Sequence, residues 1–161
     1  MNNKLNQLIE AERKALYLFD EIEKKGLIIA NKTETELNKE IFELAFELFG
    51  IKKYWHKRIV RAGKNTLLPY RENPENLTIK EDDILFFDFG PVFEDWEADV
   101  GRTYVLGNDI NKLKLKNDVE LAWLDARDFY FNNQNLTGSE FYNYVSSLAT
   151  KYGWEWAGPI G

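Results

Sequence analysis

The segment Ile84–Phe89 constrains the fold most strongly, because it places one ionisable side chain in a strand that is otherwise apolar on both faces. Its sequence is Ile-Leu-Phe-Phe-Asp-Phe, and Gly90 follows it. A short apolar run of this kind is typical of a strand buried in a sheet. Burying a lone carboxylate is costly, so Asp88 needs a partner, which can be a cation, a cluster of hydrogen-bond donors or a metal ion.

A second carboxylate, Asp99, begins the next predicted strand (99–106), eleven residues after Asp88. If the two residues face each other in an antiparallel hairpin, the turn falls between Phe93 and Glu94, inside a wide loop. Asp88 and Asp99 then share one face of the sheet. Directly opposed side chains lie about 4.5–5.5 Å apart at Cβ, where two carboxylates repel unless a cation lies between them. The spacing therefore predicts a metal site on the hairpin.

Simpler interpretations of the same residues stay open at this point. Asp88 can cap a turn before Gly90 or pair with Arg102, and Asp99 can be a solvated turn residue. The tripeptide Asp88-Phe89-Gly90 also matches the metal-binding tripeptide of protein kinases. We attribute that match to chance, because the glycine-rich loop and the His-Arg-Asp segment that accompany it in kinases are missing.

The rest of the chain predicts four helices around these strands. Helical periodicity covers 5–26, 31–50, 112–132 and 137–153, and the second and fourth of these begin with capping boxes. Residues 54–61 read as extended, and Gly and Pro residues punctuate the loop after them. The third helix is expected to turn an apolar stripe inward, made of Val119, Ala122, Trp123, Ala126, Phe129 and Tyr130. This order of elements predicts an α+β fold with helices packed outside an antiparallel sheet.

Composition excludes several classes of function. The chain has 44% apolar residues, 21 Lys and Arg against 27 Asp and Glu, and a net charge of −6, so neither nucleic acid nor an anionic membrane is an expected partner. It has no cysteine and one histidine, His56, which leaves any metal chemistry to rest on carboxylates. The N-terminus opens into an amphipathic stretch without a signal sequence, and no apolar run is long enough to span a membrane. We therefore expect a cytoplasmic protein.

Two segments resemble the metal-binding hairpin of the methionine aminopeptidase, Xaa-Pro peptidase and creatinase family, which has the pita-bread fold. They are Phe87–Gly90 and Ala98–Gly107, which together match the family pattern Asp-x-Gly, a loop, Asp-x-x-Arg-Thr and a closing Gly. Residues 56–66 resemble the family's upstream strand and Gly-x-Asn turn, and the likeness runs from Leu5 to Gly161. The resemblance implies a single pita-bread peptidase domain over residues 1–161, comprising the first half of the fold and the start of the second.

The resemblance also implies roles for individual residues. Asp88 and Asp99 become the first two of five metal ligands, with Asp99 bridging two ions, and Arg102 and Thr103 orient the ligands from a surrounding layer. The family's remaining ligands, one His and two Glu, have no counterpart here. In the family the His follows a strand like Gly158–Gly161, so the resemblance implies that this sequence stops just before the third ligand.

Three further residues are candidates for the substrate cleft. Family members tend to carry a substrate-contacting His in the loop after the Gly-x-Asn turn, where this chain has Leu68, Pro69 and Tyr70. Tyr70, together with His56 on the upstream strand and Trp96 at the hairpin tip, is therefore expected to line the cleft. A plain structural role is the alternative for each of them.

The function implied by the resemblance is metal-assisted peptide hydrolysis. Two divalent ions (Mn, Co, Zn or Fe) would serve a peptidase of the Xaa-Pro aminopeptidase type, acting on peptide substrates, with homo-oligomers covering the exposed apolar surface. The 161 residues alone are expected to be inactive, since they supply two of the five ligands. One alternative is a metal-free pita-bread module that binds peptides or proteins. Another is a structural α+β fragment in which Asp88 and Arg102 form an ion pair.

Overall fold

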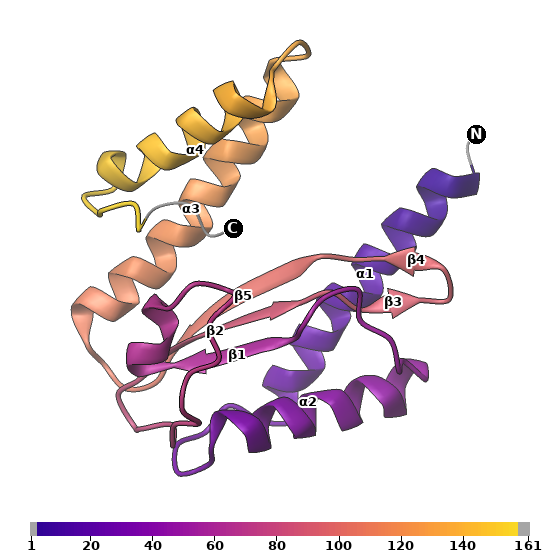
Figure 1. The fold of residues 1–161 in the computed structure, drawn as a ribbon, viewed down its shortest axis with the longest axis vertical. Helices are drawn as coiled ribbons and strands as arrows, with labels where there is room; N and C mark the ends of the chain where they lie inside the picture. Colours follow the sequence, from indigo (N-terminus) through magenta and orange to yellow (C-terminus); the bar gives the residue numbers. More distant parts are fainter. Residues whose placement is uncertain (1–2, 158–161) are drawn as a thin grey trace. The chain divides into compact units, whose positions relative to one another are not determined.

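The computed structural model describes residues 3–157 of the 161-residue chain (Figure 1). Two compact units divide the chain, one within residues 1–107 and the other within residues 108–161. The predicted strand start at 158–161 lies outside the described residues. Whether the chain forms a single domain stays a prediction.

The first unit contains two helices and a three-stranded antiparallel sheet. The strand order is β1-β2-β5, so the strand that carries Asp88 is central, and β3 and β4 form a separate two-stranded hairpin. The elements of the unit are α1 (Asn3–Lys24), α2 (Glu34–Phe49), β1 (Ile59–Ala62), the 3-10 helix η1 (Gly63–Leu67), β2 (Ile84–Phe89), β3 (Val92–Phe93), β4 (Trp96–Glu97) and β5 (Val100–Val105).

The register between β2 and β5 differs by two residues from the predicted one. Asp88 lies opposite Gly101, whereas the spacing argument placed it opposite Asp99. The chain reverses through a tight two-residue turn at Glu94 and Asp95, where Glu94 has a left-handed φ of 58°. The prediction of a wide loop centred one residue earlier was therefore wrong. Because the shift is an even number of residues, Asp88 and Asp99 still share a face, as predicted.

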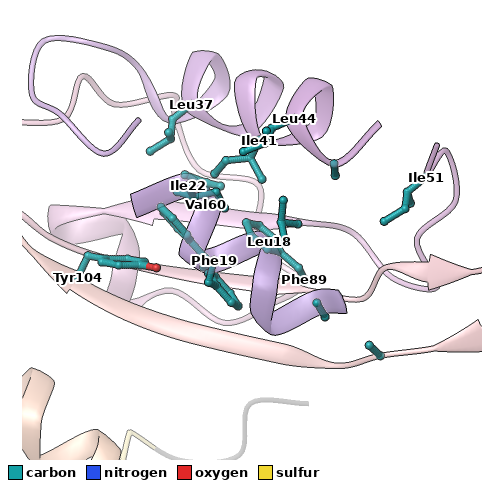
Figure 2. Close-up of a cluster of buried hydrophobic side chains, with 14 of the residues drawn as sticks. Leu18, Phe19, Ile22, Leu37, Ile41, Leu44, Ile51, Val60, Phe89 and Tyr104 are labelled. Atoms are coloured by element: carbon teal, nitrogen blue, oxygen red, sulfur yellow. The ribbon is translucent and has the colours of Figure 1, made fainter. Parts of the chain in front are cut away.

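The two faces of the sheet have different surroundings. Leu85, Phe87 and Phe89 alternate along β2 and are buried, while the side chains between them, including Asp88, are only half-buried. The strand is apolar on both faces in sequence, but only one of these faces is fully buried in the structure. The buried face packs against α1 and α2, which lie beside the sheet in Figure 1. In Figure 2 the residues of this core come from both helices, the sheet and the chain that follows α2: Leu18, Phe19, Ile22, Leu37, Ile41, Leu44, Ile51, Val60, Phe89 and Tyr104.

The helix ends follow the sequence signals. The capping box predicted for α2 is present, because the Thr33 hydroxyl accepts from the backbone N–H of Glu36 while the Glu36 carboxylate accepts from that of Thr33. Gly50 ends this helix with a left-handed φ of 69°. A glycine suits that conformation because it has no Cβ to clash with the preceding turn.

The second unit consists of a helical hairpin, α3 (Ile110–Asn132) and α4 (Gly138–Lys151), followed by irregular chain. Thr137 and Glu140 form the predicted capping box of α4. Within the described part of this unit, α4 and the chain after it are all that packs on α3, so the predicted inward stripe is mostly uncovered. Trp123 is 60% exposed and Tyr130 is 56% exposed, and these side chains line an apolar groove of 720 Å³. None of the helices described for residues 3–157 combines the length and apolar character that a bilayer span requires.

Candidate metal centre

The backbone brings His56 next to the end of β2. The Trp55 N–H donates to the Gly90 carbonyl at 2.9 Å, and the Val92 N–H donates to the Lys53 carbonyl at 3.0 Å. These bonds fix the segment before β1 against the chain that leaves β2. His56, the only histidine of the chain, therefore lies beside Asp88.

Three ionisable side chains converge at this point. His56 Nε2 lies 3.6 Å from Asp88 Oδ1 and 3.7 Å from Asp99 Oδ1. One ligand atom from each residue falls within 4.8 Å of the other two. The structure thus brings together Asp88 and Asp99, as predicted, and adds His56, which the sequence argument placed in the substrate cleft.

Two glycines keep this space open. Gly101 of β5 lies directly opposite Asp88 of β2. Because it has no side chain, it leaves the space between the Asp88 and Asp99 carboxylates unfilled. A Cβ on Gly90 would lie 2.5 Å from His56 Cδ2 and 2.5 Å from Trp55 Nε1, closer than real Cβ contacts allow. Gly90 is therefore required for the rings of Trp55 and His56 to approach the end of β2.

The imidazole of His56 is held in one orientation. Its Nδ1 lies 2.8 Å from the Lys57 carbonyl oxygen, which can only accept a hydrogen bond, so Nδ1 carries the proton. The ring meets those of Trp55 and Tyr70 edge to face, with centroids 4.3 Å and 6.0 Å away. The side chain is only 10% exposed, and its Nε2 faces the two carboxylates.

Burial raises the pKa of Asp88. Desolvation of its half-buried carboxylate is the largest cause, the nearby His56 opposes it, and the negative charge of Asp99 adds to it, while Arg61 lowers it slightly. A carboxylate that is partly desolvated and next to another carboxylate is stabilised by a cation. Oxygen and imidazole nitrogen donors in this arrangement suit Mn, Fe, Co or Zn, so the residues present fit the divalent ions that the resemblance implies.

Arg102 does not reach the carboxylates. On β5 it lies opposite Phe87 of β2, which puts its side chain on the helix-covered face of the sheet, the face away from Asp88. There it forms an ion pair with Glu23 of α1 at 2.9 Å, and its guanidinium lies 4.7 Å from the Phe19 ring centroid. The prediction that Arg102 orients the metal ligands was therefore wrong. Its side chain instead links β5 to α1. The alternative in which Asp88 pairs with Arg102 is excluded for the same reason.

Thr103, Tyr70 and Trp96 take different positions. Thr103 lies opposite Phe86 on the Asp88 face of the sheet. Tyr70 is near His56, and its hydroxyl accepts from the Lys57 N–H at 3.0 Å. Trp96 packs on the hydrophobic core of the first unit from β4. The structure thus places Tyr70 beside the candidate site and Trp96 in a packing position.

The loop that carries Tyr70 is fixed by residues that sequence reasoning did not single out. The buried guanidinium of Arg61 donates to the carbonyls of Leu68, Pro69 and Glu72. On the other side of β1, the buried carboxylate of Glu34 accepts from the backbone of Ala62 and from the side chain of Asn65. The signal that could have identified Arg61 and Glu34 is a charged residue within a segment that becomes buried, because a buried charge needs a hydrogen-bonding or ionic partner.

Comparison with known proteins decides the family. The sequence profile of metallopeptidase family M24 matches residues 6–159, almost the whole chain. The chain belongs to metallopeptidase family M24. No curated protein matches the chain closely enough to add to this assignment.

Solved structures of M24-type enzymes share the fold. The dipeptidase from Pyrococcus horikoshii OT3 is 25% identical with a TM-score of 0.77, over 94% of this chain and 41% of that one. The Xaa-Pro dipeptidase from Bacillus anthracis is 25% identical with a TM-score of 0.76, over 95% and 42%. Zinc-substituted aminopeptidase P from E. coli, in complex with product, has 15% identity and a TM-score of 0.71, over 90% and 33%. The M24 chain therefore has the α+β pita-bread fold, and it spans about two fifths or less of the length of these relatives.

Proposed function

We propose that this M24 chain forms the part of a dinuclear metallopeptidase that supplies the first two metal ligands, in an enzyme of the Xaa-Pro aminopeptidase type. The observation that carries the proposal is the convergence of Asp88 and Asp99 on one face of the sheet, in a cluster whose ligand atoms lie within 4.8 Å. The dipeptidase and aminopeptidase P structures that share the fold support the choice of peptide substrates.

The chemistry divides between the ions and the chain. Divalent ions at such a site polarise the scissile carbonyl and lower the pKa of the attacking water. The chain's own part is to hold two negative charges next to each other on a rigid sheet. Asp88 does so from a central strand, while Asp99, with a side chain that is 65% exposed, lies where a second ion and a substrate can approach.

The 161 residues alone are proposed to hold metal weakly and to lack hydrolytic activity. Two carboxylates offer four oxygen donors, whereas two divalent ions together require roughly ten ligand positions. The resemblance implies that a histidine and two glutamates supply the others. An active enzyme of this kind therefore needs ligands beyond those of the described cluster.

Self-association is a further part of the proposal. The apolar groove between α3 and α4 leaves Trp123, Tyr130 and Phe131 more than half exposed. Apolar surface of this extent is usually covered by another polypeptide. We expect a homo-oligomer in solution, which light scattering at several concentrations measures, and a monomer at all concentrations contradicts it.

The test of the function compares the unchanged sequence with two variants, both in the 161-residue chain and in any longer protein encoded by the same reading frame. Metal content is measured by elemental analysis after dialysis, and hydrolysis is measured with Xaa-Pro peptides. Asp99→Asn removes a charge from the proposed bridging position and is expected to abolish most bound metal in either protein and most activity of the longer one. Asp95→Asn makes the same change in the exposed β3–β4 turn and serves as the matched control.

Three outcomes would overturn the proposal. Metal content that is equal in the Asp99→Asn and Asp95→Asn variants would mean that the cluster is not a metal site. A longer protein that binds no metal but does bind peptide would favour the metal-free binding module. Peptide cleavage by the 161-residue chain would contradict the five-ligand scheme.

A further inference from the structure

We infer that His56 is an additional metal ligand of this site, contributed through Nε2 from the segment that precedes β1. The inference rests on the proposed metal site and adds to it, because the resemblance implies only Asp88 and Asp99 as ligands from this part of the fold.

The first step concerns the protonation of the ring. Nδ1 is engaged with the Lys57 carbonyl at 2.8 Å and must donate to it. A neutral imidazole has one N–H, so Nε2 keeps a free lone pair. Metal-bound histidines commonly have this arrangement, in which a backbone carbonyl accepts from the other ring nitrogen and fixes the tautomer.

The second step concerns distances. Nε2 lies 3.6 Å and 3.7 Å from the two carboxylate oxygens, too far for hydrogen bonds to either. Ligand atoms about 2.1 Å from one tetrahedral ion are separated from one another by about 3.4 Å. The two nitrogen–oxygen separations are close to that value, and all three ligand atoms lie within 4.8 Å of one another, so one ion can contact the nitrogen and both oxygens after the cluster contracts.

The third step concerns how the ring is held. A residue other than glycine at position 90 would collide with the imidazole, since an added Cβ would lie 2.7 Å from Nε2 itself. The indole N–H of Trp55 donates to the Ala98 carbonyl at 3.1 Å, directly before Asp99. The same segment therefore positions both the imidazole and the residue that leads into the second carboxylate, as expected for a built site.

The experiment uses the fact that the chain has a single histidine. When the 161-residue protein is labelled with ¹⁵N-histidine, every imidazole signal reports on His56. In metal-free protein we expect Nδ1 to carry a proton, because it donates to the Lys57 carbonyl. Saturation with Zn²⁺ is expected to move the Nε2 resonance to the position of a metal-bound nitrogen while Nδ1 keeps its proton. Asp88→Asn is expected to remove that shift.

Zn²⁺ affinity, measured by isothermal titration calorimetry, gives a second readout. His56→Ala removes the ligand, and Gly90→Ala displaces the ring without changing any ligand. Each is expected to weaken binding by at least about tenfold, within the 10–100-fold range seen when support for a metal ligand is lost. Gly138→Ala is the matched control, because a Cβ there meets nothing within 4 Å. Circular dichroism confirms that each variant is folded before titration.

The outcomes separate this inference from the proposed function. If Zn²⁺ binds and Asp99→Asn abolishes binding, but the Nε2 resonance and the affinity of His56→Ala are unchanged, His56 is not a ligand and the two-carboxylate site stands. If wild-type protein binds no Zn²⁺ at all, the additional ligand and the proposed metal site both fail. A Zn²⁺-induced Nε2 shift that persists in Asp88→Asn also overturns the inference, because it shows binding to the imidazole alone.

Discussion

The two units of the chain bury their apolar side chains to very different extents. In the first, α1 and α2 cover one face of a three-stranded sheet, and large side chains such as Phe19, Phe87 and Phe89 are fully buried. In the second, only Ala126 and Leu148 are buried among the described apolar residues, although both helices are well capped. Local helix signals alone therefore do not make a core, which requires a second layer to pack against. The cluster of His56, Asp88 and Asp99 lies on the unit that has such a layer.

The largest expected effect comes from emptying the core of the first unit. Phe87→Ala removes a fully buried ring that stacks with Phe19 and Phe89, and we expect it to lower the free energy of unfolding by about 3–5 kcal/mol. Phe131→Ala removes a ring that is 71% exposed, and a change within about 0.5 kcal/mol is expected. Urea denaturation followed by circular dichroism measures the unfolding free energy of each variant. Equal losses of stability in the two variants would contradict the difference in burial between the two units.

A smaller effect is expected at Glu34, the buried carboxylate that joins α2 to the loop after β1. It accepts hydrogen bonds from the Ala62 N–H at 2.6 Å and from Asn65 Nδ2 at 2.9 Å. Glu34→Gln places an amide N–H against one of these donors and is expected to cost about 1–3 kcal/mol of stability. Glu43→Gln, an exposed residue of the same helix, is the control, and a similar loss there would contradict the role given to Glu34.

The next prediction uses the pH dependence of Tyr104. Burial, and then its hydrogen bond to Glu23, raise the pKa of this phenol above its ordinary value. Above pH about 10 the Tyr104 phenol loses its proton in the unfolded chain but keeps it in the folded chain. The contribution of this phenol to the free energy of unfolding is therefore complete below pH about 10 and is lost as the pH rises further. Tyr104→Phe is expected to reduce the loss of stability above pH 10 by up to about 1.4 kcal/mol per pH unit. Denaturation curves at pH 9 and 11 test this, and an equal change in the exposed Tyr130→Phe variant would refute it.

The smallest effect on stability is expected in the groove between α3 and α4. Trp123→Gln changes a side chain that is 60% exposed, so the unfolding free energy should change by less than about 0.5 kcal/mol. The same variant should reduce the fluorescence of a dye that binds apolar surfaces, because Trp123 lines the groove. Unchanged dye binding would mean that the groove is not the exposed apolar surface of the second unit.

Much of the fold followed from local signals in the sequence. The capping boxes at Thr33 and Thr137 and the glycine at position 50 mark helix ends where the structure has them. The shared phase of Asp88 and Asp99 placed them on one face, because strand side chains alternate with a period of two residues. These are properties of a few neighbouring residues, which is why a single sequence is enough to read them.

Other features had no recognisable local signal in the sequence. The register of β2 and β5 is set by the tight turn at Glu94 and Asp95, and Glu94 is not a residue type that usually signals a left-handed turn. The side chain of Arg102 points to α1 because its neighbour on β2 is Phe87, which follows from that register. The place of His56 in the cluster depends on the pairing of Trp55 with Gly90, about 35 residues apart, which no local pattern indicates.

The central claim is that Asp88 and Asp99 hold a metal ion between them. The most direct measurement is anomalous diffraction from crystals of the protein soaked in Mn²⁺ or Co²⁺, recorded at the absorption edge of the metal. We predict an anomalous peak about 2.0–2.3 Å from carboxylate oxygens of both residues. A soaked crystal with no peak between the two carboxylates, or with peaks only elsewhere on the surface, would contradict the account.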